Sequence, residues 1–282
     1  MSISARSIAL GLGIGWAIAV LVTYTTMGQP VDAWCYYGFD QTNPWNPDGC
    51  FLYSPPVALA MEGIRAVMPF DVFYTLLRAA ELAVLIVVAG PAVGVALLIP
   101  AVAIEINAVN VNLIIVAAVL AGFRYPWTWA FIILTKVTPG VGLLWFAVRK
   151  EWSHFAIAAG ATAAFAGISL AIAPDLWSQY IAGLSVTGDS RFTIAWRLPI
   201  AVALVVWGAR TNHRWALLAA VFFALPRWYY LSPVLLVGLF PLVRFARPLR
   251  IPTWRGFRTI GLRAPQPAAA TSDGLTARAP SS

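Results

Sequence analysis

The chain has 282 residues, of which 60% are hydrophobic and only 11% are charged. Soluble domains carry about 25% charged residues, so this composition indicates an integral membrane protein and excludes an ordinary soluble enzyme. The net charge of +8 comes from short basic clusters, which predicts cytoplasmic loops under the positive-inside rule and not a nucleic-acid-binding surface.

Apolar runs of up to about 20 residues recur along the chain, as helices that cross a bilayer about 30 Å thick require. They predict an all-α, polytopic helical membrane domain over residues 1–245, with both termini in the cytoplasm. The first run has only Arg6 before it and no small-residue cleavage site, so we expect a retained span and not a signal peptide. About ten crossings are expected, approximately at 8–26, 55–69, 73–90, 92–105, 108–123, 126–148, 154–173, 195–209, 214–226 and 229–243.

One long polar loop, residues 27–54, separates the first two apolar runs and is expected on the exterior face. It holds three of the 11 acidic residues of the chain, Asp32, Asp40 and Asp48. Because membrane spans carry few polar groups, chemistry gathers where such groups cluster. We therefore expect the functional site in this loop.

The same loop contains the only two cysteines, Cys35 and Cys50. Outside the cytoplasm a disulfide forms and persists, so we expect these two residues to be bonded, with Cα atoms less than about 7 Å apart. Closing a loop of this length contributes roughly 3 kcal/mol in the chain-entropy model.

Charged and polar side chains within the expected crossings are few. Two pairs of opposite charge are spaced i, i+3, and such neighbours on a helix neutralise each other: Glu62 with Arg65, and Arg78 with Glu81. Helix capping and hydrogen bonds between helices account for a further polar cluster at an expected helix start, namely Glu105, Asn107, Asn110 and Asn112.

Lys136 differs because it lies deep in an apolar run with no acid within one helical turn. A lone cation at that depth is costly and indicates a functional site that faces an interior cavity. Pro139 is expected to break the helix and to free backbone groups nearby. This combination suits an anionic ligand such as a phosphate; the alternative is a lysine that reaches the interface or pairs with a distant acid such as Glu105.

Aromatic residues crowd the loop, and two explanations remain open: an interfacial belt or stacking on sugars. They are Trp34, Tyr36, Tyr37, Phe39, Trp45, Phe51 and Tyr53. Near the other end of the chain, Arg227, Trp228, Tyr229 and Tyr230 occupy a predicted exterior turn. That turn is on the same side as Asp32, which favours one shared site.

Motifs of soluble enzymes are absent from the sequence: there is no phosphate-binding Gly-Lys-Ser/Thr loop, no Cys-x-x-Cys and no His-Glu-x-x-His. The two histidines, His154 and His213, fall in predicted cytoplasmic loops, so neither a metal nor another cofactor is expected. Residues 246–282 form a basic tail rich in Pro and Ala, expected to be cytoplasmic, largely disordered and close to anionic headgroups.

Four stretches of the chain carry recognisable motifs. VDAWCYYGFD has an acid followed by tyrosines, and FLYSPPVALAMEGIRAVMPF has an aromatic-Tyr-x-Pro-Pro segment. NAVNVNLIIVAAVL and LTKVTPGVGLLWFAVRKEW are similar to a Gly-Gln-x-Asn helix and a Lys-x-x-Pro helix, and FALPRWYYLSPVLLVGLFPL to a late Pro-containing turn. Together these stretches resemble glycosyltransferase family 87, whose members use polyprenyl-phosphate sugars. Val109 and Asn110 stand where that family usually has Gly and Gln, and the late turn offers Arg227 and Tyr229 where Ser-Pro and His are usual.

The resemblance implies a membrane fold of the GT-C type and a hexosyltransferase that moves a sugar, most often mannose, from polyprenyl phosphate to a lipid-linked or glycan acceptor. It places the catalytic general base at Asp32. One carboxylate suffices for an inverting single displacement, which we expect here. Retention would need a second carboxylate about 5 Å away, which Asp40 or Asp48 could supply, so the geometry of the loop decides. The substrate-binding residues that it implies are Lys136, Arg227, Tyr229, Tyr36, Tyr37, Asn110, Asn112 and Tyr53.

Two other functions stay open at this point. One is a transporter or flippase of an anionic lipid, although no second half of an internal repeat is evident. The other is a non-catalytic membrane subunit built on the same scaffold, which the short chain favours.

Overall fold

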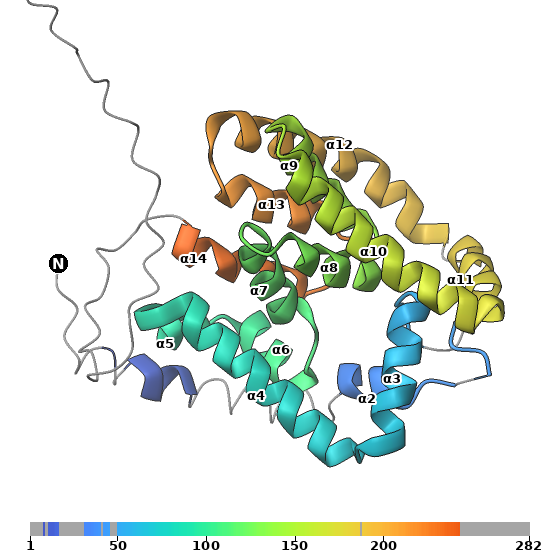
Figure 1. The fold of residues 1–282 in the computed structure, drawn as a ribbon. Helices are drawn as coiled ribbons and strands as arrows, with labels where there is room; N and C mark the ends of the chain where they lie inside the picture. The colour runs from blue at the N-terminus through green and yellow to red at the C-terminus, as the bar shows by residue number, and fades with distance from the viewer. Residues whose placement is uncertain are drawn as a thin grey trace, which may run out of the picture. The chain divides into compact units, whose positions relative to one another are not determined.

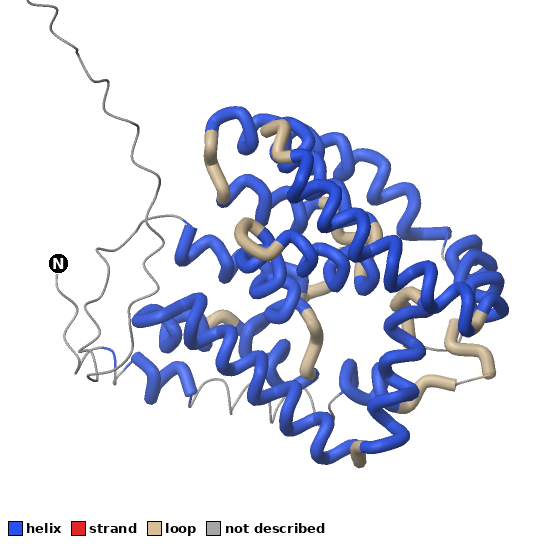
Figure 2. Tube along the Cα trace, viewed as in Figure 1, coloured by secondary structure: helices blue, strands red, loops and turns tan. Residues whose placement is uncertain are grey.

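The computed structural model describes residues 8, 11–16, 31–40, 42–45, 50–186 and 188–242, without the side chains of 185–193. Every regular element in this part of the chain is a helix (Figures 1 and 2), which confirms the all-α fold class there. The expected first crossing falls mostly outside these residues, and the expected tail, 246–282, falls outside them entirely.

Three helical segments are long and apolar enough to cross a membrane: Phe70–Leu97, Trp152–Ile172 and Ile194–Thr211. A fourth candidate is a pair of helices, Pro100–Ala108 and Asn112–Gly122, bent by 100° at a short break. By length and composition the described residues thus offer three crossings, or four if the bent pair counts as one. The number of about ten crossings stays a prediction. Hydropathy identifies apolar runs, but it does not show whether a run crosses the membrane or bends back within it.

The predicted boundary between the crossings 73–90 and 92–105 is wrong. α4 (Phe70–Ala89) continues through a 3-10 turn, η1 (Gly90–Ala92), into α5 (Val93–Leu97). Gly90 adopts φ 52°, a backbone conformation that glycine tolerates without a Cβ clash, and Pro91 lies in the first turn of η1, where a missing N–H costs little. The helical chain ends only at Leu97.

Shorter helices make up the middle of the molecule. They are α6 (Pro100–Ala108), α7 (Asn112–Gly122), η2 (Pro126–Thr128), α8 (Trp129–Thr135), η3 (Thr138–Leu143) and α9 (Leu144–Val148), followed later by α13 (Trp215–Phe223), η4 (Ser232–Gly238) and α14 (Leu239–Leu242). α7 packs against α4, α8 and η4, while α13 packs against η3 and η4. Their contact surfaces bury a largely aliphatic core that includes Leu113, Ile115, Leu217, Leu218 and Leu235.

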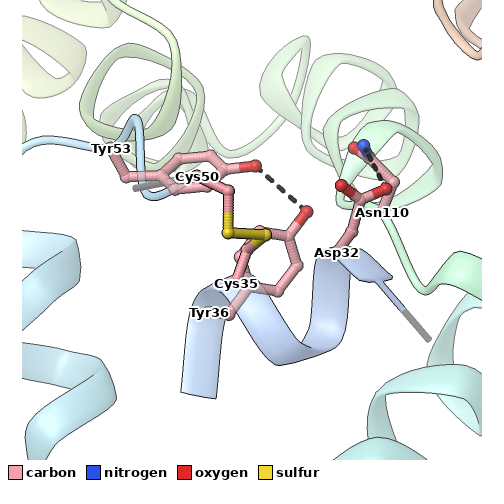
Figure 3. The surroundings of a disulfide bond; sticks show 6 residues. All are labelled: Asp32, Cys35, Tyr36, Cys50, Tyr53 and Asn110. Atoms are coloured by element: carbon pink, nitrogen blue, oxygen red, sulfur yellow. Dashed lines mark hydrogen bonds between the residues drawn. A yellow bond between two sulfur atoms is a disulfide. The ribbon is translucent and has the colours of Figure 1, made fainter. Parts of the chain in front are cut away.

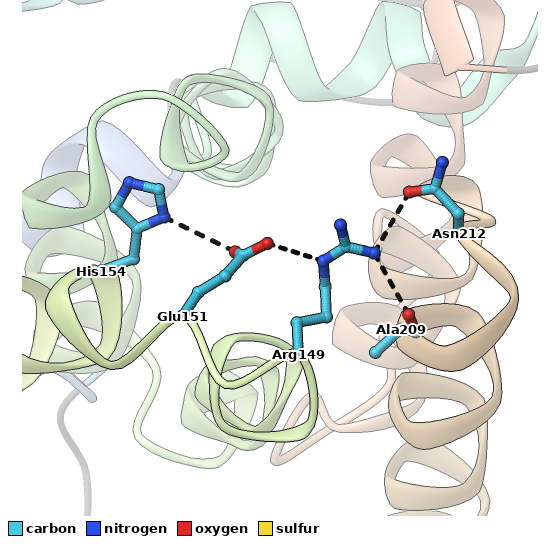
Figure 4. A network of polar contacts seen from close by, with 5 residues as sticks. All are labelled: Arg149, Glu151, His154, Ala209 and Asn212. Atoms are coloured by element: carbon cyan, nitrogen blue, oxygen red, sulfur yellow. Dashed lines mark hydrogen bonds and ion pairs between the residues drawn. The ribbon is translucent and has the colours of Figure 1, made fainter. Parts of the chain in front are cut away.

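α10 (Trp152–Ile172) connects two chemically different ends of the fold. Its 21 residues span about 31 Å at 1.5 Å per residue, close to the thickness of a bilayer. It begins beside the end of α12 (Gly188–Thr211), where Arg149 donates hydrogen bonds to Ala209 and Asn212 (Figure 4). At its far end it is followed by α11 (Pro174–Val186), whose Tyr180 ring lies 5.3 Å from that of Trp45 in the polar loop.

Candidate functional site

The polar loop is held together by a short helix and a disulfide. α2 (Val31–Tyr37) carries Asp32 in its first turn and Cys35 one turn later. Cys35 is bonded to Cys50, with the two Cα atoms 5.5 Å apart (Figure 3), within the limit of about 7 Å expected from the sequence. The bond fixes the end of the loop against the helix that presents Asp32.

Most of the aromatic residues of the loop form a small core of their own. Tyr36, Phe39, Phe51 and Tyr53 are buried together with Phe73 of α4. Tyr53 Oη donates a hydrogen bond of 3.0 Å to Tyr36 Oη (Figure 3). Packing therefore accounts for these rings, an explanation that the sequence analysis did not weigh beside belts and sugar stacking.

Asp32 meets the bend between α6 and α7. Asn110 Nδ2 donates a hydrogen bond of 3.0 Å to Asp32 Oδ2 across 78 positions of sequence (Figure 3). The preceding residue, Val109, is fully buried and adopts φ 58° and ψ 56°. The left-handed region costs a non-glycine residue about 1–2 kcal/mol, so the bend is strained at the point where it meets the loop.

Glu105 holds this bend from the inside. Its carboxyl group is fully buried and accepts three hydrogen bonds: from Asn112 N at 2.8 Å, Asn112 Nδ2 at 3.1 Å and Leu113 N at 3.3 Å. Two of these donors are free backbone N–H groups at the start of α7, which otherwise lack partners. A side chain of α6 thus caps the next helix and sets the angle between the two.

Lys136 lies at a second helix break, directly opposite the first. α8 ends at Thr135, and Lys136 has extended backbone angles before η3 begins at Thr138. Lys136 Nζ donates a hydrogen bond of 2.8 Å to Asn112 Oδ1. The lysine therefore reaches Glu105 through Asn112, a bridged version of the pairing considered from the sequence.

The loop is also attached to this second break. Ser54 donates from both its backbone N and its Oγ to the carbonyl of Leu134, at 3.3 and 2.5 Å. Two residues later the chain reaches Lys136. We refer to Asp32, Glu105, Asn110, Asn112 and Lys136 as the bend cluster.

Burial alters the acidity of the groups in the loop. It raises the pKa of Asp32 above the 3.8 of an aspartic acid in water, while the hydrogen bond from Asn110 and the charge of Lys136 counter part of that rise. Burial also raises the pKa of Tyr36 and of Tyr53, so both hydroxyl groups stay protonated at neutral pH. In contrast, hydrogen bonds from Thr42 lower the pKa of the exposed Asp40.

The late turn lies within electrostatic range of the bend cluster. Partial burial raises the pKa of Tyr230, and the charges of Asp32 and Glu105 raise it further. The turn is supported by Arg197, a buried side chain that donates to the carbonyls of Leu225 at 3.0 Å and Pro226 at 3.2 Å.

Of the site residues predicted from the sequence, the structure brings six to the bend or next to it: Asp32, Tyr36, Tyr53, Asn110, Asn112 and Lys136. Tyr37 is used differently, because its hydroxyl group donates to the carbonyl of Met68 at 2.8 Å. Within the described part of the chain, no side-chain hydrogen bond joins Arg227 or Tyr229 to this cluster, and Asp48 lies outside that part.

Neither of the two predicted i, i+3 ion pairs forms. Arg78 donates to Tyr74 Oη at 3.1 Å, and Arg65 donates to the carbonyl of Phe39 at 3.2 Å. Both oxygens of Glu81 are buried and have no hydrogen-bond partner in the part of the chain that the structure describes. The arginines turn toward aromatic side chains, which offer their guanidinium groups a ring face.

Sequence reasoning missed the central role of Glu105, the isolation of Glu81 and the support from Arg197. A usable signal existed for all three, because each is a charged residue in an otherwise apolar run. What the run did not reveal was which of them finds hydrogen-bond partners.

Among the described residues, no group of three or more His, Cys, Asp or Glu side chains is placed to hold a metal ion. Comparison of the chain with protein-family models, with curated proteins and with solved structures finds no match. The chemistry of the site therefore has to be argued from its own residues.

Those residues combine three properties. Asp32 is a half-buried carboxyl group with one oxygen held by an amide, and Lys136 supplies a cation at a helix break close by. Asn110 Oδ1 is buried with no hydrogen-bond partner in the described residues. A ligand that carries both hydroxyl and anionic groups matches this set: its hydroxyl groups could donate to Asp32 or to Asn110 Oδ1, and its anionic group could pair with Lys136.

Proposed function

We propose that this protein is a membrane glycosyltransferase of the GT-C type, similar to glycosyltransferase family 87. It moves a sugar, most often mannose, from polyprenyl phosphate to a lipid-linked or glycan acceptor at the exterior face. The observation that carries the proposal is the bend cluster. An acid from the polar loop, Asp32, is hydrogen-bonded to Asn110, and a lysine from a helix break, Lys136, is hydrogen-bonded to Asn112, two positions further on.

The proposed reaction is a single displacement at the anomeric carbon. The hydroxyl oxygen of the acceptor forms the new bond to this carbon while the bond to the phosphate oxygen breaks. Asp32 takes the proton of the attacking hydroxyl group, and the phosphate leaves with both bonding electrons beside Lys136, whose charge stabilises it. A second carboxylate is not needed for inversion, which agrees with Asp40 being exposed and occupied by Thr42.

The backbone at the bend supports the resemblance. Family 87 usually has Gly-Gln where this chain has Val109 and Asn110. Val109 adopts a left-handed conformation, which favours glycine, so the usual glycine suits the same bend. A glutamine in place of Asn110 would likewise offer an amide N–H to the acid.

The arrangement of charges supports the proposed topology, with the loop outside and both termini in the cytoplasm. The basic turn at Arg149 contacts the end of α12, whose last turn carries Arg210 and which Arg214 follows. The polar loop packs near the other end of α10, about one bilayer thickness away. We propose that the short helices between these ends complete the crossings expected from hydropathy.

The test is transfer by the purified full-length protein in detergent. Polyprenyl-phosphate mannose and a set of lipid-linked acceptors are supplied, and mass spectrometry detects an acceptor that is heavier by one hexose. The product should form with wild-type protein and not with Asp32→Asn. Absence of any product with a broad set of donors and acceptors would contradict the proposal and favour a non-catalytic subunit.

One observation favours a second candidate, a transporter of an anionic lipid. Two broken helices meet at Lys136 and Asn112, and broken helices that face each other form substrate sites in many transporters. Reconstitution in vesicles with a fluorescent lipid phosphate separates the two functions. Movement of the lipid between leaflets without any sugar transfer would select the transporter.

A further inference from the structure

Glu81 is an ionisable residue whose side chain is buried without a hydrogen-bond partner in the described part of the chain. It lies on α4, and both of its carboxyl oxygens lack such a partner. A buried carboxylate without a partner costs many kcal/mol, so such a group either binds a cation or keeps a proton.

Among the described residues, no cation forms an ion pair with Glu81. The charged groups that act on it are Arg78 on the same helix, Glu105 on α6 and, at longer range, Asp32 on α2. The other elements that pack against α4, namely η1, α5, α7, α14 and η4, contain no charged residue. Arg78 itself is turned to the hydroxyl group of Tyr74 at 3.1 Å.

The three carboxyl groups are solvated very differently by the protein. Glu105 accepts three hydrogen bonds, and Asp32 accepts one from Asn110 and lies near Lys136. Hydrogen bonds and cations favour the ionised form, so these two groups accept a negative charge more readily than Glu81 does. Glu81 receives no donor from the described residues, and the mutual repulsion of the three acids acts on it as well.

We propose that Glu81 is a proton-binding site within the helical core, and that its proton keeps the bend cluster able to accept an anionic ligand. With Glu81 neutral, the two charged acids face one lysine. With Glu81 ionised, a third negative charge opposes the entry of a phosphate. The second half of this inference rests on the proposed function; the first half does not.

The proton is tested without any substrate. Infrared difference spectra at neutral pH compare wild type with Glu81→Gln and with Glu81→Met, whose apolar side chain of similar length suits the core. Both differences should contain the C=O stretching band of a carboxylic acid, present only in wild type. The matched control is Glu151→Gln, because Glu151 is ion-paired with Arg149 at 2.7 Å and should contribute no such band. Absence of the acid band from whichever Glu81 variant folds would overturn the proposal.

The consequence for ligands is tested by calorimetry with farnesyl phosphate from about pH 7, where the phosphate is a dianion, up to the pH at which the infrared acid band of Glu81 disappears. Binding to wild type should weaken by about tenfold over that range, while Glu81→Gln should lose clearly less, because only the remaining ionisable groups then titrate. Equal losses in both proteins would refute the coupling. If the acid band is found but farnesyl phosphate does not bind at any pH, the proton site stands and the proposed function fails.

Discussion

The polar network at the basic end of α10 and the bend cluster are built on different principles. At the basic end, Arg149, Glu151, His154 and Asn212 form a network at the surface (Figure 4). The side chains of Arg149 and Glu151 are each 32% exposed, and their atoms pair at 2.7 Å. The bend cluster is instead buried at Glu105 and Asn112, which are 0% and 2% exposed.

The two groupings differ in which of their polar atoms lack a hydrogen-bond partner. The Arg149 guanidinium group has partners in Glu151, Ala209 and Asn212, and water reaches the rest. At the bend, Asn110 Oδ1 is buried without a partner among the described residues, and so are both oxygens of Glu81 on α4, which packs against α6 and α7. Buried polar groups normally find partners. At the basic end His154 Nδ1 also lacks a hydrogen bond, but it lies 3.5 Å from Glu151 Oε2. Asn110 Oδ1 has no such neighbour among the described residues, so the bend cluster is incomplete in the way expected of a site that binds a ligand.

The largest expected effect follows from replacing Asp32. Asp32→Asn keeps the shape and the neighbour Asn110 but cannot accept a proton, so sugar transfer should fall about 10²–10⁴-fold. Steady-state transfer measured by mass spectrometry checks this result. Asp40→Asn is the matched control, because its side chain is exposed and bonded only to nearby Thr42. A large loss in the control, or none in Asp32→Asn, would move the base elsewhere.

The next largest effect is on the free energy of unfolding, and it compares Glu105 of the bend cluster with Glu151 of the basic network. The carboxyl group of Glu105 accepts hydrogen bonds from Asn112 and Leu113. Glu105→Gln replaces one acceptor oxygen by an amide N–H that faces a donor, and should lower the free energy of unfolding by about 3 kcal/mol or more. Glu151→Gln loses an exposed pair and should cost less than about 1 kcal/mol. Thermal unfolding in detergent measures both. Similar costs at the two positions would mean that Glu105 does not cap α7.

Glu105 and Glu81 show how much of the site could be predicted from the sequence. Composition predicted an all-helical membrane protein, and the two cysteines in one polar loop predicted their bond. Lys136 was recognised as unusual because a lone cation in an apolar run is costly. The sequence did not reveal that Glu105 caps the next helix while Glu81 remains alone, because both stand in similar apolar runs. What distinguishes them is the bend at Val109, after which N–H groups of α7 donate to Glu105. Valine rarely adopts the left-handed backbone of this bend.

A third prediction concerns pH and uses the opposite shifts of Asp32 and Asp40. A general base must be ionised, so the transfer rate should fall as the pH drops through the pKa of the base. Burial raises the pKa of Asp32 above 3.8, so the acid limb should lie above that value. Hydrogen bonds from Thr42 lower the pKa of Asp40, so a limb below 3.8 would point to Asp40.

Asn110→Ala sharpens the same measurement. The variant removes a donor that favours the ionised form of Asp32, so the acid limb of kcat/KM should move to higher pH. Thr42→Val, which changes the neighbour of Asp40, should leave the limb in place. A limb that responds to Thr42→Val and not to Asn110→Ala would contradict the assignment of the base.

The smallest expected effect tests whether the basic end is as independent of the site as its exposure indicates. Arg149→Met removes the pairing with Glu151 but keeps an apolar stem over Trp145, whose ring the guanidinium group now faces at 5.7 Å. Because exposed pairs contribute about 0.2–1 kcal/mol and are screened within about 8 Å at physiological salt, the loss of stability should be small at low salt. It should shrink further at about 1 M salt, while sugar transfer in detergent stays unchanged. A salt-insensitive loss, or a fall in transfer, would show that this network reaches the bend cluster through α10 or α12, and the contrast between the two groupings would then be wrong.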